Sequence, residues 1–255
     1  MCLSYQQSNK TVSANGVEFH YSLDGEVSKP VLALVNMASV NLTAWEPVLG
    51  ALLKSYRILR FDIRGTGKSG WGNDDEFTFS QYADDLAAIM DVLQLPNAFV
   101  LGVAYGARTA AQFALRHEDK LTALGLFDVA LTPPVEQSQQ KILASQARQL
   151  LDEVGENEIV PKKSWRFYEN RDAAFKAHTA HQHEPDTSEM LEKLKIPVLV
   201  ACGRQDMNLH EAQRIANAIP SGRFELMEMT GHGSPFYRPT LFASIVNDFK
   251  QELMF

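Results

Sequence analysis

One short stretch of the chain has the spacing of a turn that presents a nucleophile, but the nucleophile itself is missing. In "GVAYGAR" (residues 102–108) the glycines have the spacing G-x-S-x-G, and Ala104 occupies the serine position. Such glycines allow a sharp strand-to-helix turn that presents the central side chain beside a helix N-terminus. A methyl group cannot attack a carbonyl carbon, so the chain as written has no seryl-ester chemistry. For this segment alone, a tight packing turn is the alternative interpretation.

An acidic residue and a histidine follow, each directly after a run of apolar residues. Asp206 lies in "VACGRQDMNL" and His232 lies in "MTGHGSPFYRP". If both runs are parallel strands, these side chains lie at the carboxyl ends of the strands, where open α/β sheets build their sites. There a histidine can take and return the proton of a nucleophile, while the acid orients the imidazole. Asp128 in "LGLFD" is a rival acid, and the structural alternatives are a helix cap for Asp206 and a loop position for His232.

The elements that must position these residues alternate between strands and helices. This alternation is typical of a parallel sheet covered by helices on both faces, so we predict an α/β fold. The expected strands are 17–23, 30–36, 56–62, 98–103, 121–128, 196–203 and 223–229. The expected helices are 45–53, 79–95 with Ser80 as its N-cap, 105–117, 210–219 and 241–253.

The alternation is interrupted once. Residues 132–190 are polar and have helical periodicity, with amphipathic helices expected at 136–154 and 164–178. We therefore predict a core domain formed by 1–131 and 191–255. The inserted segment is expected to be a helical lid over the pocket, because small-molecule sites in such folds lie between core and insertion.

A further motif shows which family the chain resembles. The stretch "RFDIRGTGKSG" (60–70) contains D-x-R-G-x-G-x-S directly after a predicted strand. Together with "GVAYGAR" and the order of acid and histidine, it resembles the α/β-hydrolase fold family over nearly the whole chain. The resemblance implies a mostly parallel sheet with helices on both faces and one short helical lid insertion. It also implies that Arg64 is a structural residue of a turn rather than a catalytic one.

The same resemblance implies roles for individual residues. Asp206 is the preferred acid because "CGRQD" is similar to the family's G-x-x-D acid loop. The oxyanion hole is expected from the backbone N–H groups of Tyr105 and Met37. The Asn36-Met37 pair in "VNMASVNLTAW", where many relatives have His-Gly, is similar to the 3-oxoadipate enol-lactonase branch.

The expected function is hydrolysis of a small ester, lactone, thioester or cleavable ketone by a Ser-His-Asp triad. Trp165 and Phe236 are expected to contact this carbonyl substrate. Three accounts of Ala104 stay open. It replaces a serine and inactivates the enzyme, it belongs to a natural pseudohydrolase that binds a small molecule, or the His–Asp pair alone serves a cofactor-free lyase, isomerase or oxygenase.

The composition of the chain restricts the classes of partner that it is expected to bind. The 255-residue chain has a net charge of −7 and no basic block, which argues against nucleic acid or an anionic membrane as a partner. It has no apolar run of about 18 residues that would span a bilayer. Two distant cysteines, Cys2 and Cys202, and the absence of a secretory pattern predict a cytoplasmic location. No cofactor or metal is expected, because His178, His181 and His183 are interpreted as a solvated face. A homo-oligomer stays open.

Overall fold

A central sheet of eight strands organises the described part of the chain. The computed structural model describes residues 10–73, 76–131, 138–179 and 188–253. The strands are β1 Lys10–Ala14, β2 Val17–Asp24, β3 Val31–Val35, β4 Arg57–Phe61, β5 Ala98–Val103, β6 Leu121–Phe127, β7 Val198–Gln205 and β8 Gly222–Gly231. Their order in the sheet is β1-β2-β4-β3-β5-β6-β7-β8, and only the β1–β2 and β2–β4 pairs are antiparallel. The mostly parallel sheet predicted from the sequence is confirmed.

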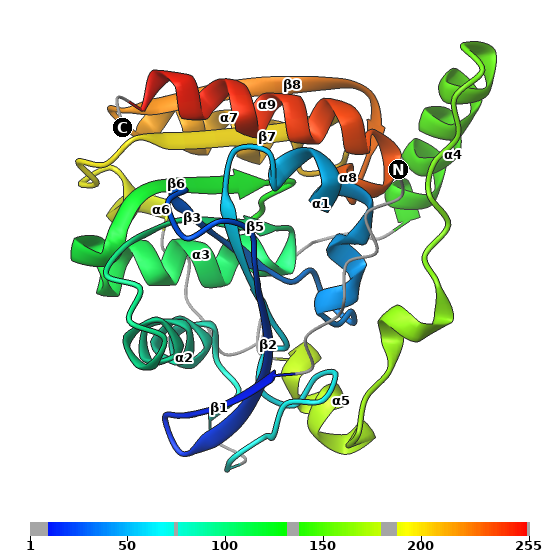
Figure 1. The fold of residues 1–255 in the computed structure, drawn as a ribbon. Coiled ribbons are helices and arrows are strands. Elements are labelled where there is room, and N and C mark those ends of the chain that lie inside the picture. The colour runs from blue at the N-terminus through cyan, green and yellow to red at the C-terminus, as the bar shows by residue number, and fades with distance from the viewer. Residues whose placement is uncertain (1–9, 74–75, 132–137, 180–187, 254–255) are drawn as a thin grey trace.

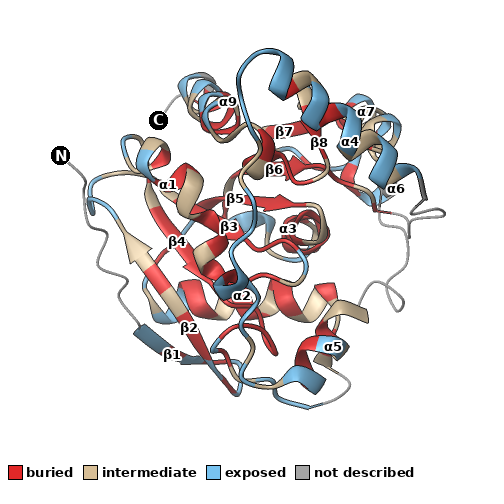
Figure 2. Cartoon of the chain, turned by 90° about the vertical axis from the view of Figure 1, so that its right-hand side faces the viewer, coloured by how far each residue is buried: buried red, intermediate tan, exposed pale blue. Residues whose placement is uncertain are grey.

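Helices cover both faces of this sheet (Figure 1). One face packs against α2 Phe79–Val92, α3 Tyr105–Arg116 and α7 Leu209–Ala218. The other face packs against α1 Glu46–Leu52 and α9 Pro239–Glu252. Because every β5 side chain is buried between the two layers, the sequence of this strand is continuously apolar. In Figure 2 the buried residues follow the strands and the inner sides of these helices.

Two local features differ from the predictions. The strand β1 was not expected, although Asn15 and Gly16, both at positive φ, form an Asn-Gly hairpin turn between β1 and β2. The N-cap of α2 is Thr78 rather than Ser80. Thr78 has the extended backbone of a cap, and its Oγ1 accepts a hydrogen bond from Gln81 N at 3.1 Å, whereas Ser80 already lies inside the helix.

The inserted region is helical but not continuous. Its described elements are α4 Ser138–Glu153, the 3-10 helix η4 Lys163–Arg166, α5 Arg171–Thr179 and α6 Ser188–Leu191. The predicted single helix over 164–178 is wrong, because residues 167–170 leave the helix and Tyr168 pairs with Gly67 of the core. The Asn170 side chain then starts α5 by accepting hydrogen bonds from Asp172 N and Ala173 N. In the described ranges, no helix is both long and apolar enough to cross a membrane.

Candidate active site

The turn that carries Ala104 has the strained geometry of a nucleophile elbow. Ala104 lies between β5 and α3 with φ 52° and ψ −110°, a conformation that side-chain-bearing residues rarely adopt. A Cβ on Gly102 would lie 2.1 Å from Gly106 O, and a Cβ on Gly106 would lie 2.3 Å from Val35 O. Both glycines are therefore required by the close approach of backbone to backbone. The strain at Ala104 favours a functional elbow over a plain packing turn.

Asp206 and His232 come together at the carboxyl ends of β7 and β8. The Asp206 Oδ2 and His232 Nδ1 atoms lie 3.0 Å apart, and the carboxylate is buried. The second oxygen of Asp206 accepts a hydrogen bond from Asn208 N at 2.9 Å, so the acid loop holds its own carboxylate in place. Because Nδ1 faces the acid, Nε2 is the imidazole nitrogen available to a reacting group. His232 and Ala104 line the same cavity.

Asp128 holds the loop after His232 instead of the imidazole itself. It is fully buried at positive φ, and its Oδ2 accepts hydrogen bonds from Gly233 N at 3.1 Å and Ser234 N at 2.7 Å. Its Oδ1 is buried without a hydrogen-bond partner. Between the two candidate acids, the structure therefore places Asp206 in contact with the histidine.

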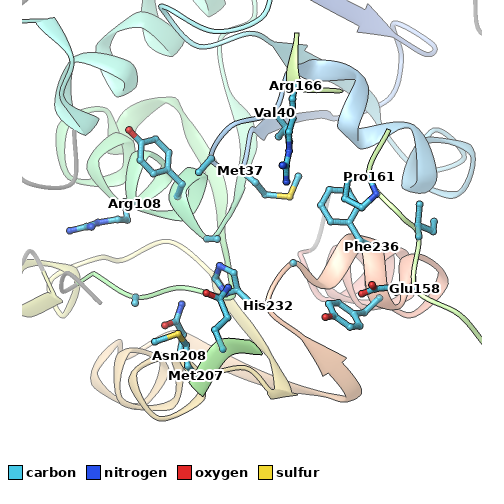
Figure 3. Close-up of a pocket in the computed structure, with 18 of the residues that line it drawn as sticks. Met37, Val40, Arg108, Glu158, Pro161, Arg166, Met207, Asn208, His232 and Phe236 are labelled. Atoms are coloured by element: carbon cyan, nitrogen blue, oxygen red, sulfur yellow. The ribbon is translucent and has the colours of Figure 1, made fainter. Parts of the chain in front are cut away.

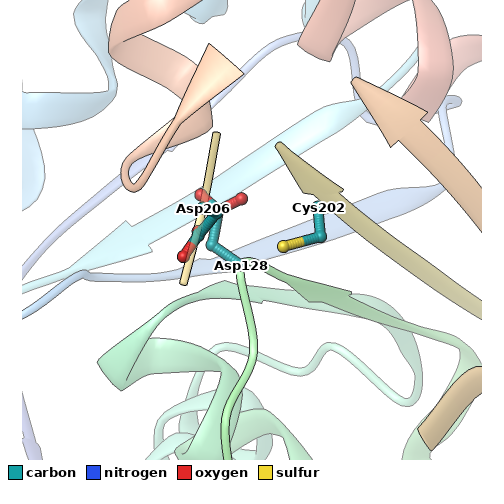
Figure 4. Close-up of side chains that lie close together, drawn as sticks. All are labelled: Asp128, Cys202 and Asp206. Carbon is teal, nitrogen blue, oxygen red and sulfur yellow. The ribbon is translucent and has the colours of Figure 1, made fainter. Parts of the chain in front are cut away.

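The acid that contacts His232 belongs to a buried cluster of two carboxylates and one thiol (Figure 4). Oxygen atoms of Asp128 and Asp206 and the Cys202 Sγ lie within 4.8 Å of one another. Burial, followed by the charge of Asp206, raises the pKa of Asp128 to about 6. Burial lowers the pKa of His232, but the Asp206 and Asp128 carboxylates outweigh it and raise that pKa to about 9. Burial and the two carboxylates also raise the pKa of the Cys202 thiol far above its ordinary value, so Cys202 remains protonated. Because both carboxylates raise the pKa of His232, the cluster is suited to stabilising an imidazolium.

The loop after β3 is fixed by a side chain whose role the sequence did not predict. The buried Asn36 donates from Nδ2 to Phe61 O at 2.9 Å and accepts from Trp45 Nε1 at 2.9 Å. These contacts hold the backbone next to Met37, which lines the cavity together with Tyr105. Asn36 thus positions the loop from which the second oxyanion donor is expected.

A cavity of about 520 Å³ opens beside these residues (Figure 3). Phe236 lines it, as expected for a substrate contact. Trp165 does not line it, because its ring stacks behind Phe236 at a centroid distance of 5.3 Å and only 1% of the residue is exposed. Charged residues that the sequence analysis did not single out also line the cavity: Arg108, Arg148, Glu158 and Arg166.

His178 differs from its predicted place on a solvated face. His178 is partly buried, and its Nε2 lies 2.7 Å from Ser39 Oγ in the loop after β3. Burial lowers the pKa of His178, so its ring is neutral at neutral pH. The interpretation of His178 as solvated is therefore wrong. His181 and His183 lie outside the described residues.

Comparison with known proteins agrees with this architecture. The family described as "alpha/beta hydrolase fold" matches residues 35–148. A protein named as a carbamate hydrolase from Caulobacter sp. strain K31 is 28% identical, over 81% of this chain and 85% of its own. The 3-oxoadipate enol-lactonase 2 of Acinetobacter baylyi is 23% identical, over 91% and 92%.

Among solved structures, the enol-lactonase from Burkholderia xenovorans LB400 superimposes with a TM-score of 0.78. It is 25% identical in sequence, and the alignment covers 95% of this chain and all of that one. Sheet order, elbow and family match together define the class of the protein. The chain has the α/β-hydrolase fold and is similar in sequence to members of that family.

Proposed function

We propose that this chain is built for hydrolysis of a small ester, lactone, thioester or cleavable ketone, and that position 104 is its nucleophile position. In this proposal the chain with Ala104 binds its substrate but does not turn it over. The observation that carries the proposal is the pairing of His232 with Asp206 beside a strained elbow whose central residue faces the same cavity. The names of two relatives, a carbamate hydrolase and an enol-lactonase, describe acyl compounds of this chemical kind.

The proposed chemistry follows from the positions of these groups once serine replaces Ala104. The serine Oγ attacks the carbonyl carbon while His232 Nε2 takes its proton, and Asp206 stabilises the imidazolium. The backbone N–H groups of Met37 and Tyr105 are proposed to hold the oxyanion of the tetrahedral intermediate. His232 then protonates the leaving group, and water releases the acyl group by the reverse sequence.

Binding without turnover is expected because the elbow does not depend on the hydroxyl. The elbow is shaped by Gly102 and Gly106, and Ala104 N donates to Phe127 O at 2.8 Å. Loss of the serine oxygen therefore removes attack and leaves positioning intact.

The inserted segment is proposed to act as a lid that sets substrate choice. Six of its described residues line the cavity opposite the core: Gln140, Arg148, Glu158, Ile159, Pro161 and Arg166. This placement supports the proposal, because the wall of a pocket far from the reacting groups selects the remainder of the substrate.

The test is hydrolysis of p-nitrophenyl esters of increasing acyl length by the chain and by its Ala104→Ser variant. We expect a burst and steady turnover only in the serine form, with a gain in kcat of about 10⁶, the size of the loss on removing the serine of another hydrolase. A double variant that adds His232→Gln should lose this gain.

Calorimetry with an intact substrate should give similar affinities for Ala104 and Ala104→Ser, since only attack differs. Equal turnover by both forms would mean that His232 acts without a nucleophile, as in a lyase, isomerase or oxygenase. Absence of turnover in both, with binding retained, would favour a non-catalytic binding protein.

A further inference from the structure

Within the described part of the chain, not every charged side chain of the cavity has a partner of opposite charge. Three arginines, Arg108, Arg148 and Arg166, line it together with one acid, Glu158. This excess of positive charge is notable in a chain whose net charge is −7. The contacts of each arginine decide whether its charge is available to a ligand.

Two of the arginines are held by the protein. Arg148 Nε donates to Glu158 Oε1 at 2.5 Å, so this pair cancels its own charge. Arg108 donates to Leu131 O at 2.7 Å, and its guanidinium lies 4.8 Å from the centre of the Phe79 ring. Arg108 is therefore held against the core, and Arg148 is paired within the inserted segment.

The third arginine, Arg166, differs from the other two in its contacts. Among the described residues no carboxylate pairs with its guanidinium, which is exposed at the cavity wall. In Figure 3 this side chain extends to the cavity beside Met37, while His232 lies on the other side of the cavity. Burial, followed by the positive charge of Arg166, lowers the pKa of His178, and this histidine supplies no negative charge to pair with the arginine.

The backbone that carries Arg166 is fixed to the core. Asn41 N donates to Trp165 O at 2.7 Å, and Asn41 Nδ2 donates to Ser164 O at 2.7 Å. The buried Trp165 ring, stacked on Phe236, anchors the same turn. An arginine on a fixed backbone loses less freedom when a ligand binds, which favours recognition.

We propose that the cavity accepts a substrate with a carboxylate remote from its reacting carbonyl, and that Arg166 binds this carboxylate. The planar guanidinium fork matches a carboxylate with two parallel hydrogen bonds, whereas a neutral ester would leave the charge without a partner. The inference rests on the proposed function, because it places the reacting carbonyl beside residue 104 and His232. The free carboxylate then lies at the lid side of the cavity.

The test compares paired probes in the Ala104→Ser background. The mono-p-nitrophenyl esters of succinic, glutaric and adipic acid are assayed against the same esters with the free acid methylated. Arg166→Gln should lower kcat/KM for the best carboxylate probe about 10-fold. This loss is at the lower end of the range for a hydrogen bond to a charged group, because the site is open to water. The methylated probes should change by less than about twofold, since they present no charge.

Lys163→Gln is the matched control, because Lys163 lies on the same 3-10 helix, is exposed and does not line the cavity. It should leave both probe series unchanged. Equal losses for charged and methylated probes in Arg166→Gln, or no loss for either, would overturn the inference while leaving the proposed hydrolysis intact.

A binding measurement separates this inference from catalysis. Monomethyl adipate and dimethyl adipate are titrated calorimetrically into the Ala104 chain and into its Arg166→Gln variant. We expect tighter binding of the monoester, and a loss of that preference of about 10-fold in the variant. If the monoester does not bind, or if its binding is independent of Arg166, the inference fails even where Ala104→Ser hydrolyses neutral esters. If the preference is present but Ala104→Ser is inactive, the proposed hydrolysis fails and the carboxylate site stands.

Discussion

Replacing Asp128 with asparagine should make the protein more stable at neutral and alkaline pH. The carboxylate of Asp128 is fully buried, one of its oxygens has no hydrogen-bond partner, and it lies close to Asp206. The folded state therefore disfavours the charged form, and the pKa rises from 3.8 to about 6. An asparagine keeps an oxygen for the N–H groups of Gly233 and Ser234 and removes the charge.

The size and sign of the expected change in stability follow from this shift in pKa. A displacement from 3.8 to about 6 corresponds to an upper limit of about 3 kcal/mol between the two protonation states. The folded state binds the Asp128 proton more tightly than the unfolded state does. The resulting stabilisation is fully present below the pKa of the unfolded chain, and it is lost as the pH rises through about 6. Because the ionised carboxylate also attracts the His232 cation, we expect a gain for Asp128→Asn of about 1–3 kcal/mol at pH ~8. The gain should shrink toward pH ~4.5.

Urea unfolding of the two proteins across this pH range measures the effect. Asp128→Ala is the matched control, because it also removes the charge but leaves Gly233 N and Ser234 N without an acceptor. It should be less stable than Asp128→Asn by about 1–3 kcal/mol. The reasoning is refuted if Asp128→Asn is less stable than the parent at pH ~8, or if its difference from the parent does not vary with pH. NMR titration should also show a lower pKa for His232 in Asp128→Asn, because one of the two carboxylates that raise it is gone.

Two further predictions concern the helix cap and the histidine. Thr78→Ala should lower the free energy of unfolding by about 1 kcal/mol, and Ser80→Ala should change it by less than about 0.5 kcal/mol. Urea unfolding measures both changes. A larger loss for Ser80→Ala than for Thr78→Ala would contradict the observed cap. In the Ala104→Ser background, kcat/KM for a neutral ester should rise with pH up to about 9, because His232 accepts the serine proton only when neutral. A profile already flat above pH ~7 would contradict the cationic histidine.

Local patterns in the sequence were sufficient to predict the core and the order of its site residues. The continuous apolar run of β5 and the periodicity of α2 each predict their own element, because burial between two helical layers requires them. Parallel strands end at one edge of a sheet, so Ala104, Asp206 and His232 could be expected near one another without coordinates. Their assigned roles remain proposals, but their proximity follows from topology.

Contacts between segments far apart in the sequence determined the structural features that local patterns did not predict. Residues 164–178 have helical periodicity, yet pairing of Tyr168 with Gly67 interrupts the helix. The contact of His178 with Ser39 also depends on where the inserted segment meets the core. The same holds for the contrast between Arg148, which pairs with Glu158, and Arg166, for which the described residues offer no carboxylate partner. No spacing along the chain encodes these pairings, because the partners are separated by loops whose path only the packed structure determines. The sequence thus determined which edge of the sheet carries the candidate site, and the tertiary structure determined which charged side chains line the cavity beside it.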